Sequence, residues 1–458
     1  MANRTLLKGG WVVTMAAGEA PFRGDVLIED QRISAVGRLD AVEDAEIVDA
    51  GRHIVLPGFV DSHRHMWQSA LRMIACDWTL EQYFARMRGE LAPRFGPEDT
   101  YAATLLGVME ALDAGITTVV DWSHNINSPD DADSAWQALV DGGGRAVFSY
   151  GTSNAQALSR DGSPHTRDVE RMRNGVGSSD SGRITLGMAL RGPEFSGPAA
   201  WKHDWGLARE LGLPVTVHVG GGLPGASGSI FRLDEQGLLG DDTTFVHCSM
   251  LSDAELDRIA ATGGRASVSP EVEANMGHGA PATRRLRERG IPTGLSADVC
   301  TNVGGDMFGG MRVALALQRG ADHAEALNRG VTLQHGSLTA RDVLEMATIG
   351  SAAACGLDGR IGSLEAGKQA DVVVLRADTP GLVPLVDPVG AATMAAGVHN
   401  VDTVFVAGRA VKRDGRLVDL ERTRVLELAQ RSHERLLADV DHHAWRAPVG
   451  RRPSDVER

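Results

Sequence analysis

The sequence predicts an α/β fold: a TIM-like (β/α)8 barrel with a small β-sandwich built from both chain ends. Two observations lead to this prediction. Between residues 58 and 355, short apolar runs alternate with longer amphipathic stretches, which is typical of a parallel sheet whose faces are covered by helices. The segments on either side of this region instead read as short strands separated by turn residues.

The strands of the barrel are predicted from apolar runs that turn residues interrupt. Helical stretches such as 100–115 and 253–263 lie between these runs. Eight βα units fit a TIM-like barrel, which typically takes about 250 residues before insertions. The eight predicted strands are 58–65, 117–124, 145–151, 184–192, 214–221, 243–250, 265–273 and 292–300.

The two strand-rich flanks are expected to fold together. Neither 1–56 nor 360–420 is large enough to bury a good core alone, so we predict that they form one composite β-sandwich. The barrel, residues 57–359, would then be inserted between its halves. Residues 421–458 are predicted to be a C-terminal helix followed by a tail.

The composition and net charge of the chain argue against nucleic acid and membranes as binding partners. The net charge of −14 and pI near 5.5 give no electrostatic reason to bind nucleic acid or an anionic membrane. The four cysteines form no CxxC pair, and no apolar run approaches the length of a membrane span or a signal peptide. We therefore expect a cytoplasmic protein that acts on a small molecule, without nucleic-acid or membrane partners. We also expect a homodimer or a higher homo-oligomer.

Polar residues at the ends of the predicted strands carry the chemistry. His63 and His65 end the first strand and, being two apart, point to the same side. His218 ends the fifth strand, His247 the sixth and Asp298 the eighth. Because the carboxyl ends of barrel strands meet at one mouth, these five side chains should converge there.

Each of these residues also has a purely structural interpretation. A histidine at a strand end is often a hydrogen-bonded core residue, and Asp298 could cap a helix. The combination of an HxH pair, two later strand-end histidines and a carboxylate on the eighth strand instead favours a metal site.

Four segments resemble a known group of metal-dependent hydrolases. PGFVDSHRHMWQ resembles the opening motif of the amidohydrolase superfamily. VHCSMLSDAEL, SADVCTNVGGDMFGGMR and GRIGSLEAGKQADVVVL resemble its branch of cytosine deaminases, guanine deaminases and triazine hydrolases. The resemblance spans almost the whole chain. It implies a single divalent metal, Zn2+ first and Fe2+ second.

The resemblance also assigns roles. It implies that His63, His65, His218 and Asp298 bind the metal, and that His247 contacts the substrate or the attacking water. Asp298 would also accept a proton from that water. Binuclear relatives usually bridge their metals with a carboxylated lysine on the fourth strand. Here that strand has no lysine, and Lys202 falls in the following helix, so one metal per chain is expected.

One departure from the branch concerns proton transfer. Deaminases of the branch carry HxxE on the fifth strand, and the glutamate moves a proton to the leaving amine. In this chain Gly221 stands at that position. The predicted seventh strand offers Glu271 and Glu273 instead, two apart and thus on one face, with His278 in the next loop. The structural alternative is a salt bridge for one carboxylate and a helix cap for the other.

Further candidates for substrate binding follow the HxH pair or end the second strand. Trp67 and Gln68 come directly after the pair, and His124 ends the second strand. With His278, they complete the predicted substrate contacts. Trp78 and Tyr83 lie in a long excursion, 66–96, that can roof the pocket, although each aromatic is equally consistent with a core position.

These observations predict a metal-dependent hydrolase that cleaves a C–N bond in a small nitrogen-containing, heterocyclic substrate. Deamination, ring opening and hydrolysis of an amide or urea-type bond all remain open. The absent glutamate also leaves open displacement of chloride or thiolate, which needs no strong acid. An inactive ligand-binding derivative is the alternative outside enzymology, and the intact set of ligands argues against it.

Overall fold

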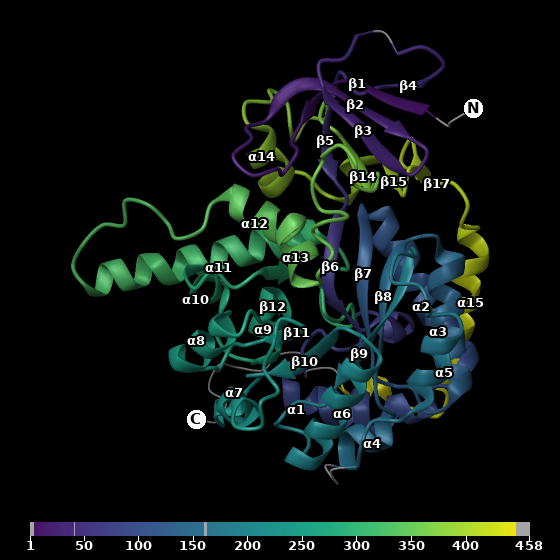
Figure 1. The fold of residues 1–458 in the computed structure, drawn as a ribbon, viewed down its shortest axis with the longest axis vertical. Coiled ribbons are helices and arrows are strands. Elements are labelled where there is room, and N and C mark those ends of the chain that lie inside the picture. Colours follow the sequence, from purple (N-terminus) through teal and green to yellow (C-terminus); the bar gives the residue numbers. More distant parts are fainter. Residues whose placement is uncertain (1–3, 41, 160–162, 446–458) are drawn as a thin grey trace.

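The computed structural model describes residues 4–40, 42–159 and 163–445, and its centre is an eight-stranded parallel sheet (Figure 1). Neighbouring strands follow one another in chain order from β6 to β13, which is the order of a (β/α)8 barrel. The strands are β6 Phe59–Arg64, β7 Ile116–Ser123, β8 Arg145–Tyr150, β9 Ile184–Leu190, β10 Val215–Val219, β11 Thr243–His247, β12 Arg265–Val268 and β13 Thr293–Leu295.

The first and last strands meet at the mouth of this barrel. The backbone N–H of His65 donates to the carbonyl of Asp298 over 2.8 Å, and the N–H of Asp298 donates to the carbonyl of His63 over 3.1 Å. These bonds bring the metal-binding motif of the first strand beside the carboxylate that follows the eighth. The predicted TIM-like barrel is confirmed.

Helices surround the barrel in Figure 1, as its buried strands require. The longest, α11, reaches outward together with the segment that follows it. The helices of the barrel region are α2 Pro97–Asp113, α3 Pro129–Gly142, α4 Asn154–Ser159, α5 Asp168–Asn174, α6 Pro198–Glu210, α7 Ser229–Asp234, α8 Asp253–Ala261, α9 Pro270–Met276, α10 Thr283–Glu288, α11 Met307–Asn328, α12 Ala340–Met346 and α13 Ile349–Ala354, with the 3-10 helix η4 Leu223–Ala226.

Both chain ends contribute to a second, nine-stranded mixed sheet. β5 from the N-terminal flank pairs antiparallel with β14 from the C-terminal flank, which joins the two halves. The composite β-unit is therefore confirmed, while the domain boundaries at 56/57 and 359/360 stay predictions. Its strands are β1 Arg4–Val12, β2 Phe22–Glu29, β3 Arg32–Gly37, β4 Glu46–Asp49, β5 His53–Pro57, β14 Val372–Arg376, β15 Val401–Val406, β16 Arg409–Arg413 and β17 Arg416–Leu417.

Short helical segments cover the mouth and form what we call the roof, residues 66–96. The roof has its own apolar cluster, which also takes in Val272 and Met276 of α9 and Leu436 of the C-terminal helix. It consists of η1 Met66–Leu71, α1 Leu80–Tyr83, the π-helix η2 Phe84–Leu91 and η3 Ala92–Arg94. Trp78 and Tyr83 belong to this cluster and are buried in it.

The predicted C-terminal helix is α15 Arg422–Leu437, and the 3-10 turn η7 His442–Trp445 follows it. His433 Nδ1 lies 2.8 Å from the carbonyl of Ala70, so α15 holds the roof from outside. The predicted tail from residue 446 lies outside the described residues. Three further short elements lie in the chain between β14 and β15: α14 Pro388–Gly390, η5 Ala391–Ala395 and η6 Val398–Asn400.

Several predicted barrel strands are longer than the observed ones, and the difference in the seventh, predicted as 265–273, changes the site. β12 ends at Val268, and the chain continues as helix α9 from Pro270. A proline at the first helical position already has the required φ and needs no N–H partner, so the helix begins there. The prediction that Glu271 and Glu273 share one face of a strand is therefore wrong.

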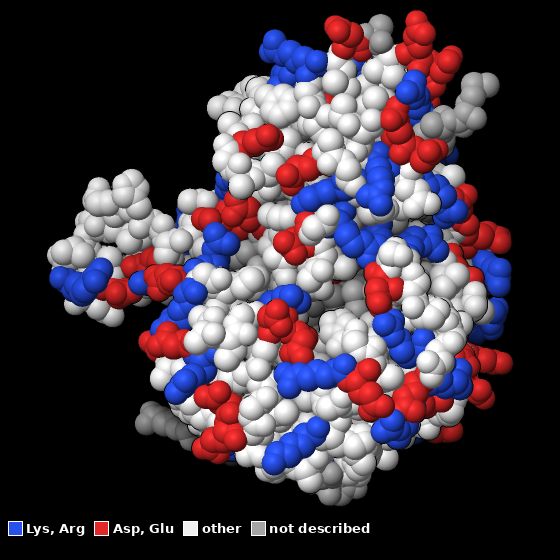
Figure 2. Space-filling view, in the orientation of Figure 1, with Lys and Arg blue, Asp and Glu red and all other residues white. Residues whose placement is uncertain are grey.

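On the face shown in Figure 2, acidic and basic side chains are interspersed. Within the described part of the chain, none of the helices has both the length and the apolar character that a membrane crossing requires.

Candidate metal centre

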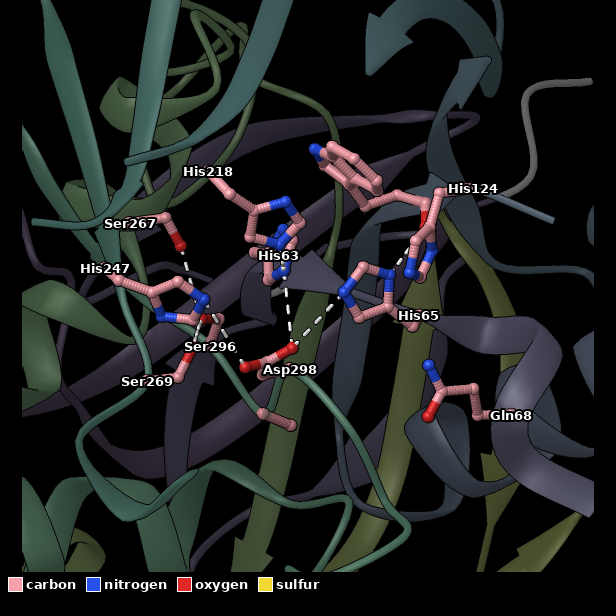
Figure 3. Close-up of polar contacts among 12 residues, drawn as sticks. His63, His65, Gln68, His124, His218, His247, Ser267, Ser269, Ser296 and Asp298 are labelled. Atoms are coloured by element: carbon pink, nitrogen blue, oxygen red, sulfur yellow. Dashed lines mark hydrogen bonds and ion pairs between the residues drawn. The ribbon is translucent and has the colours of Figure 1, made fainter. Parts of the chain in front are cut away.

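Three histidines and one carboxylate converge at the mouth of the barrel (Figure 3). The Nε2 atoms of His63 and His218 lie 3.2 Å apart. Oδ1 of Asp298 lies 3.4 Å from Nε2 of His63 and 3.5 Å from Nε2 of His65. The potential ligand atoms of His63, His65 and Asp298 all fall within 4.8 Å of one another. Imidazole nitrogens and a carboxylate at this spacing suit Zn2+ or Fe2+.

The orientation of His65 is set from outside the cluster. Its Nδ1 lies 2.7 Å from the carbonyl oxygen of Trp122, at the end of β7. Since a carbonyl only accepts, Nδ1 carries the proton and the lone pair of Nε2 faces Asp298. Burial lowers the pKa of His65 to about 3, so the ring stays neutral. Such an outer hydrogen bond is the usual support of a metal-binding histidine.

The other ligand candidates are also in the protonation states that bind metal. Loss of surrounding water lowers the pKa of His63, and that of His218 well below its usual value. Burial would raise the pKa of Asp298, but the neighbouring His63, His247 and His65 bring it well below its ordinary value. Neutral imidazoles beside an ionised carboxylate are ready to coordinate a cation.

The backbone is strained at two of these positions. His247 has φ of 76° and Asp298 has φ of 57°, both in the left-handed region that residues with a side chain rarely adopt. Strain of this kind persists where the surrounding structure enforces it, and it concentrates at functional sites. Here it aims two strand-end side chains into the mouth of the barrel.

His247 has a carboxylate behind it. Its Nδ1 lies 3.2 Å from Oε1 of Glu273, and its Nε2 lies 3.8 Å from Oδ2 of Asp298. Glu273 is fully buried, and its Oε1 also accepts the backbone N–H of Ser269 over 2.8 Å. Burial favours the neutral form of His247, but the bond to Glu273 and the charge of Asp298 raise its pKa overall. His247 is thus the one histidine of this cluster poised to carry a proton.

Glu271 does not join the cluster. It lies two residues before Glu273 on α9, where that spacing sends side chains to opposite sides of a helix. It is half-buried, and its pKa is raised by burial and by the nearby Asp306. The predicted catalytic partnership of the two glutamates is therefore corrected. Because they lie on helix α9, only Glu273 contacts the cluster.

His278 fills the space beside Gly221. A Cβ at Gly221 would lie 3.3 Å from Cδ2 of His278, and the N–H of Gly222 donates to the carbonyl of His278 over 2.8 Å. The His278 ring is 4.5 Å from that of His247, and its Nδ1 is buried without a partner. His278 therefore stands where the glutamate of related deaminases was expected.

The roof and the residue after β7 supply the remaining predicted contacts. Trp67 Nε1 donates to Nδ1 of His124 over 3.2 Å, and the His124 ring is 4.0 Å from that of His65. Gln68 Nε2 donates to the hydroxyl of Tyr83 over 2.6 Å, while its Oε1 is buried without a partner. Trp67, Gln68 and His124 thus line the same side of the cluster as His65 (Figure 3 shows Gln68 and His124).

Two polar residues near the site were missed from the sequence. Glu194, after β9, accepts the N–H of Gly220 over 3.1 Å, and its Oε2 is buried without a partner. Arg88, on η2, is 1% exposed beside Trp67. A carboxylate directly after the fourth barrel strand was a usable signal for Glu194. Nothing local marks Arg88, because it lies in a helical stretch with several other arginines.

Comparison with protein families gives one match over most of the chain. The model described as the amidohydrolase family matches residues 54–411, a range that contains every residue of the metal cluster from His63 to Asp298. The chain belongs to the amidohydrolase family. The resemblance expected from the sequence motifs is confirmed.

Curated relatives cover nearly the full length of this amidohydrolase. A 5'-deoxyadenosine deaminase of Methanothermobacter thermautotrophicus is 30% identical, over 94% of this chain and 98% of the relative. A 5-methylthioadenosine/S-adenosylhomocysteine deaminase of Desulforudis audaxviator is 29% identical, over 95% of this chain and 100% of the relative.

Solved structures share the fold. An adenosine deaminase from Xanthomonas campestris with bound zinc has a TM-score of 0.80 at 24% identity, covering 95% of this chain and 98% of the other. An atrazine chlorohydrolase from Arthrobacter aurescens complexed with zinc has a TM-score of 0.80 at 23% identity, covering 94% and 100%. The His/Asp cluster and these zinc-bound neighbours support a divalent metal site.

Proposed function

We propose that this amidohydrolase hydrolyses a C–N bond of a small nitrogen heterocycle, by deamination, ring opening or cleavage of an amide or urea-type bond. The observation that carries the proposal is the convergence of His63, His65, His218 and Asp298 at the barrel mouth, with His247 beside them. The names of the curated relatives, which are deaminases of adenosine derivatives, support a heterocyclic substrate.

The four convergent residues would hold one Zn2+ or, as the second choice, Fe2+. Such a metal would supply a water-derived nucleophile at neutral pH. The carboxylate of Asp298 would hold a proton within the cluster. The Nε2 of His247 lies 3.8 Å from Oδ2 of Asp298, and this ring would deliver a proton to the leaving group.

Glu273 takes over part of the role of the missing fifth-strand glutamate in this proposal. It does so through His247, because its Oε1 contacts Nδ1 of that ring and no ligand of the cluster. Trp67, Gln68, His124 and His278 surround the reacting centre and would position the heterocycle.

The direct test is an activity screen of the zinc-loaded protein. Aminopyrimidines, aminopurines, 5'-deoxyadenosine, cyclic amides and cyclic ureas would be assayed for ammonia release or ring opening. We expect turnover of at least one class, lost on chelation and restored by Zn2+. His63→Ala serves as the matched inactive control. Release of chloride or thiol from halogenated or thiolated heterocycles, without any C–N cleavage, would contradict the proposal.

That second outcome is the alternative function. Gly221 favours it, because a site without the fifth-strand carboxylate suits a leaving group that departs without protonation. The same screen, extended to chlorinated and thiolated heterocycles, separates the two functions by the product released.

Metal analysis provides a prediction independent of substrate. We expect about one equivalent of Zn or Fe per chain by elemental analysis, because fourth strand β9 has no lysine to bridge a second metal. Lys202, the next lysine, is exposed on α6. His63→Ala and Asp298→Ala should each lose most of the metal. Since His247, His278 and Asp298 form a further group of potential ligands, two equivalents on purified protein would refute the mononuclear site.

The cellular setting is part of the same proposal. All four cysteines are free thiols, which suits the reducing cytoplasm.

We propose a homodimer or higher homo-oligomer, which sedimentation equilibrium would establish.

A further inference from the structure

Arg88 is a buried cation without a counter-charge. It lies on η2 of the roof and is 1% exposed. Its Nη2 donates to the carbonyl of His124 over 3.1 Å, and its Nη1 is buried without a hydrogen-bond partner. Within the described ranges, none of the acidic side chains forms an ion pair with it.

Two other buried arginines of this chain pair with carboxylates. Arg145, 4% exposed, is held by both carboxylate oxygens of Asp371 at 2.8 and 3.0 Å. Arg64, 1% exposed, forms ion pairs with Glu110 and Asp61. An isolated buried charge is strongly unfavourable, so the absence of a carboxylate at Arg88 calls for a partner from outside the chain.

Arg88 stays charged despite its burial. Loss of solvation lowers the pKa of its guanidinium to about 10, which leaves it protonated at neutral pH. The ring of Trp67 lies 5.8 Å from its central carbon and makes a weak cation–π contact, which does not neutralise the charge. A full positive charge is therefore available in the roof.

This charge lies close to the part of the metal cluster that His65 and His124 form. The carbonyl that Arg88 contacts belongs to His124, whose ring is 4.0 Å from that of the metal-ligand candidate His65. Arg88 sits on a π-helix, an element found frequently at functional sites.

We propose that Arg88 binds a carboxylate of the substrate, so that the heterocycle hydrolysed here is a monoanion. This inference rests on the proposed function and adds the charge of the substrate to it. A planar guanidinium with a free Nη1 matches the two oxygens of a carboxylate. A single cation is balanced by a singly charged group, which favours a carboxylate over a phosphate.

The test compares heterocycles in matched pairs. Each pair carries either a carboxylate or a carboxamide on the same ring position, such as cytosine-5-carboxylate with cytosine-5-carboxamide, and 2-aminopyrimidine-4-carboxylate with its carboxamide. For zinc-loaded protein, kcat/KM is measured where hydrolysis occurs, and Kd by isothermal titration calorimetry where it does not. We expect a preference for carboxylates of about tenfold to a hundredfold, the range of a charge-assisted hydrogen bond.

Variants assign this preference to Arg88. Arg88→Met should reduce the ratio between carboxylate and carboxamide to near one, while zinc content stays at the wild-type level. Arg88→Lys, which keeps the charge, should recover part of the ratio. Arg86→Met is the matched control, because Arg86 lies on the same helix but stacks on Trp78 and Trp445 away from the cluster. It should keep the wild-type ratio.

The outcomes separate this inference from the proposed function. If carboxamides are hydrolysed and no carboxylate is preferred, C–N hydrolysis stands and the inference about Arg88 is overturned. If carboxylates bind through Arg88 but no C–N bond is cleaved, the inference stands and the proposed function fails. A carboxylate preference that survives in Arg88→Met also overturns the assignment to Arg88.

Discussion

At the scale of single residues, the surroundings of each histidine decide whether it is suited to bind the metal or to transfer a proton. Burial keeps His63 and His65 neutral, whereas the carboxylate of Glu273 raises the pKa of His247 against the same effect of burial. Groups of one chemical type whose environments push their pKa values apart commonly divide the acid–base work of an active site. His247 therefore differs from the ligand histidines because of its partner.

The contact between Glu273 and His247 gives a prediction at this scale. Glu273→Gln keeps the shape of the side chain but removes the negative charge behind Nδ1 of His247. We expect kcat to fall by roughly 10- to 100-fold, as for other residues that orient an active histidine, with normal zinc content. Steady-state kinetics and elemental analysis measure the two effects.

Glu271→Gln is the control for this prediction, because Glu271 lies on the same short helix but outside the cluster. It should keep kcat close to that of the wild type. Full activity of Glu273→Gln would show that His247 needs no carboxylate. A fall in kcat together with zinc loss would instead indicate a structural role for Glu273.

At the scale of elements, the first barrel strand is held close to its neighbour by a small residue. A Cβ at Gly58, directly before β6, would lie 2.1 Å from Oγ1 and 2.4 Å from Cγ2 of Thr117 on β7. The N–H of Gly58 donates to the carbonyl of Asp371 over 2.9 Å. Since β6 leads into His63 and His65, the close packing here also sets the height of the metal ligands.

Gly58→Ala should therefore displace β6 from β7. We expect it to lower the stability by about 1–3 kcal/mol, the usual effect of overpacking, and to weaken zinc retention during dialysis. Gly206→Ala is the matched control, because a Cβ there meets nothing within 4 Å on helix α6. It should be neutral or slightly stabilising, since alanine favours helix more than glycine does. Equal urea midpoints for both variants would contradict this account.

At the scale of the whole molecule, the composite sheet and the barrel are joined by a buried ion pair. Arg145 begins β8 of the barrel, and Asp371 directly precedes β14 of the composite sheet. Asp371 Oδ1 also accepts the N–H of Ala407 over 2.7 Å. The guanidinium of Arg145 in the barrel therefore depends on a carboxylate that the composite sheet provides.

Removing one partner of this pair should be far worse than removing both. Asp371→Leu leaves Arg145 buried and unpaired, and we expect a loss of about 3–5 kcal/mol. The double variant Arg145→Met with Asp371→Leu should recover much of that loss, because it removes the isolated charge. Urea denaturation compares the three proteins. A double variant as unstable as Asp371→Leu would mean that the pair contributes specific bonds beyond charge neutralisation.

The sequence by itself determined the features that depend on local spacing. Apolar runs between amphipathic stretches predicted the eight barrel strands, and turn residues marked the two flanking sets of strands, because these patterns follow from backbone geometry over a few residues. The order of His63, His65, His218, His247 and Asp298 at strand ends predicted the metal cluster, because a barrel brings equivalent strand ends together.

Only the tertiary structure decided which carboxylate serves which histidine and which charge lacks a partner. Pro270 could have signalled a helix, but the contact of Glu273 with His247 joins segments that are 26 residues apart in the chain. That Arg88 lacks a carboxylate while Arg145 has one depends on every neighbour from distant segments. Local sequence patterns do not encode such contacts, because packing of the complete chain creates them.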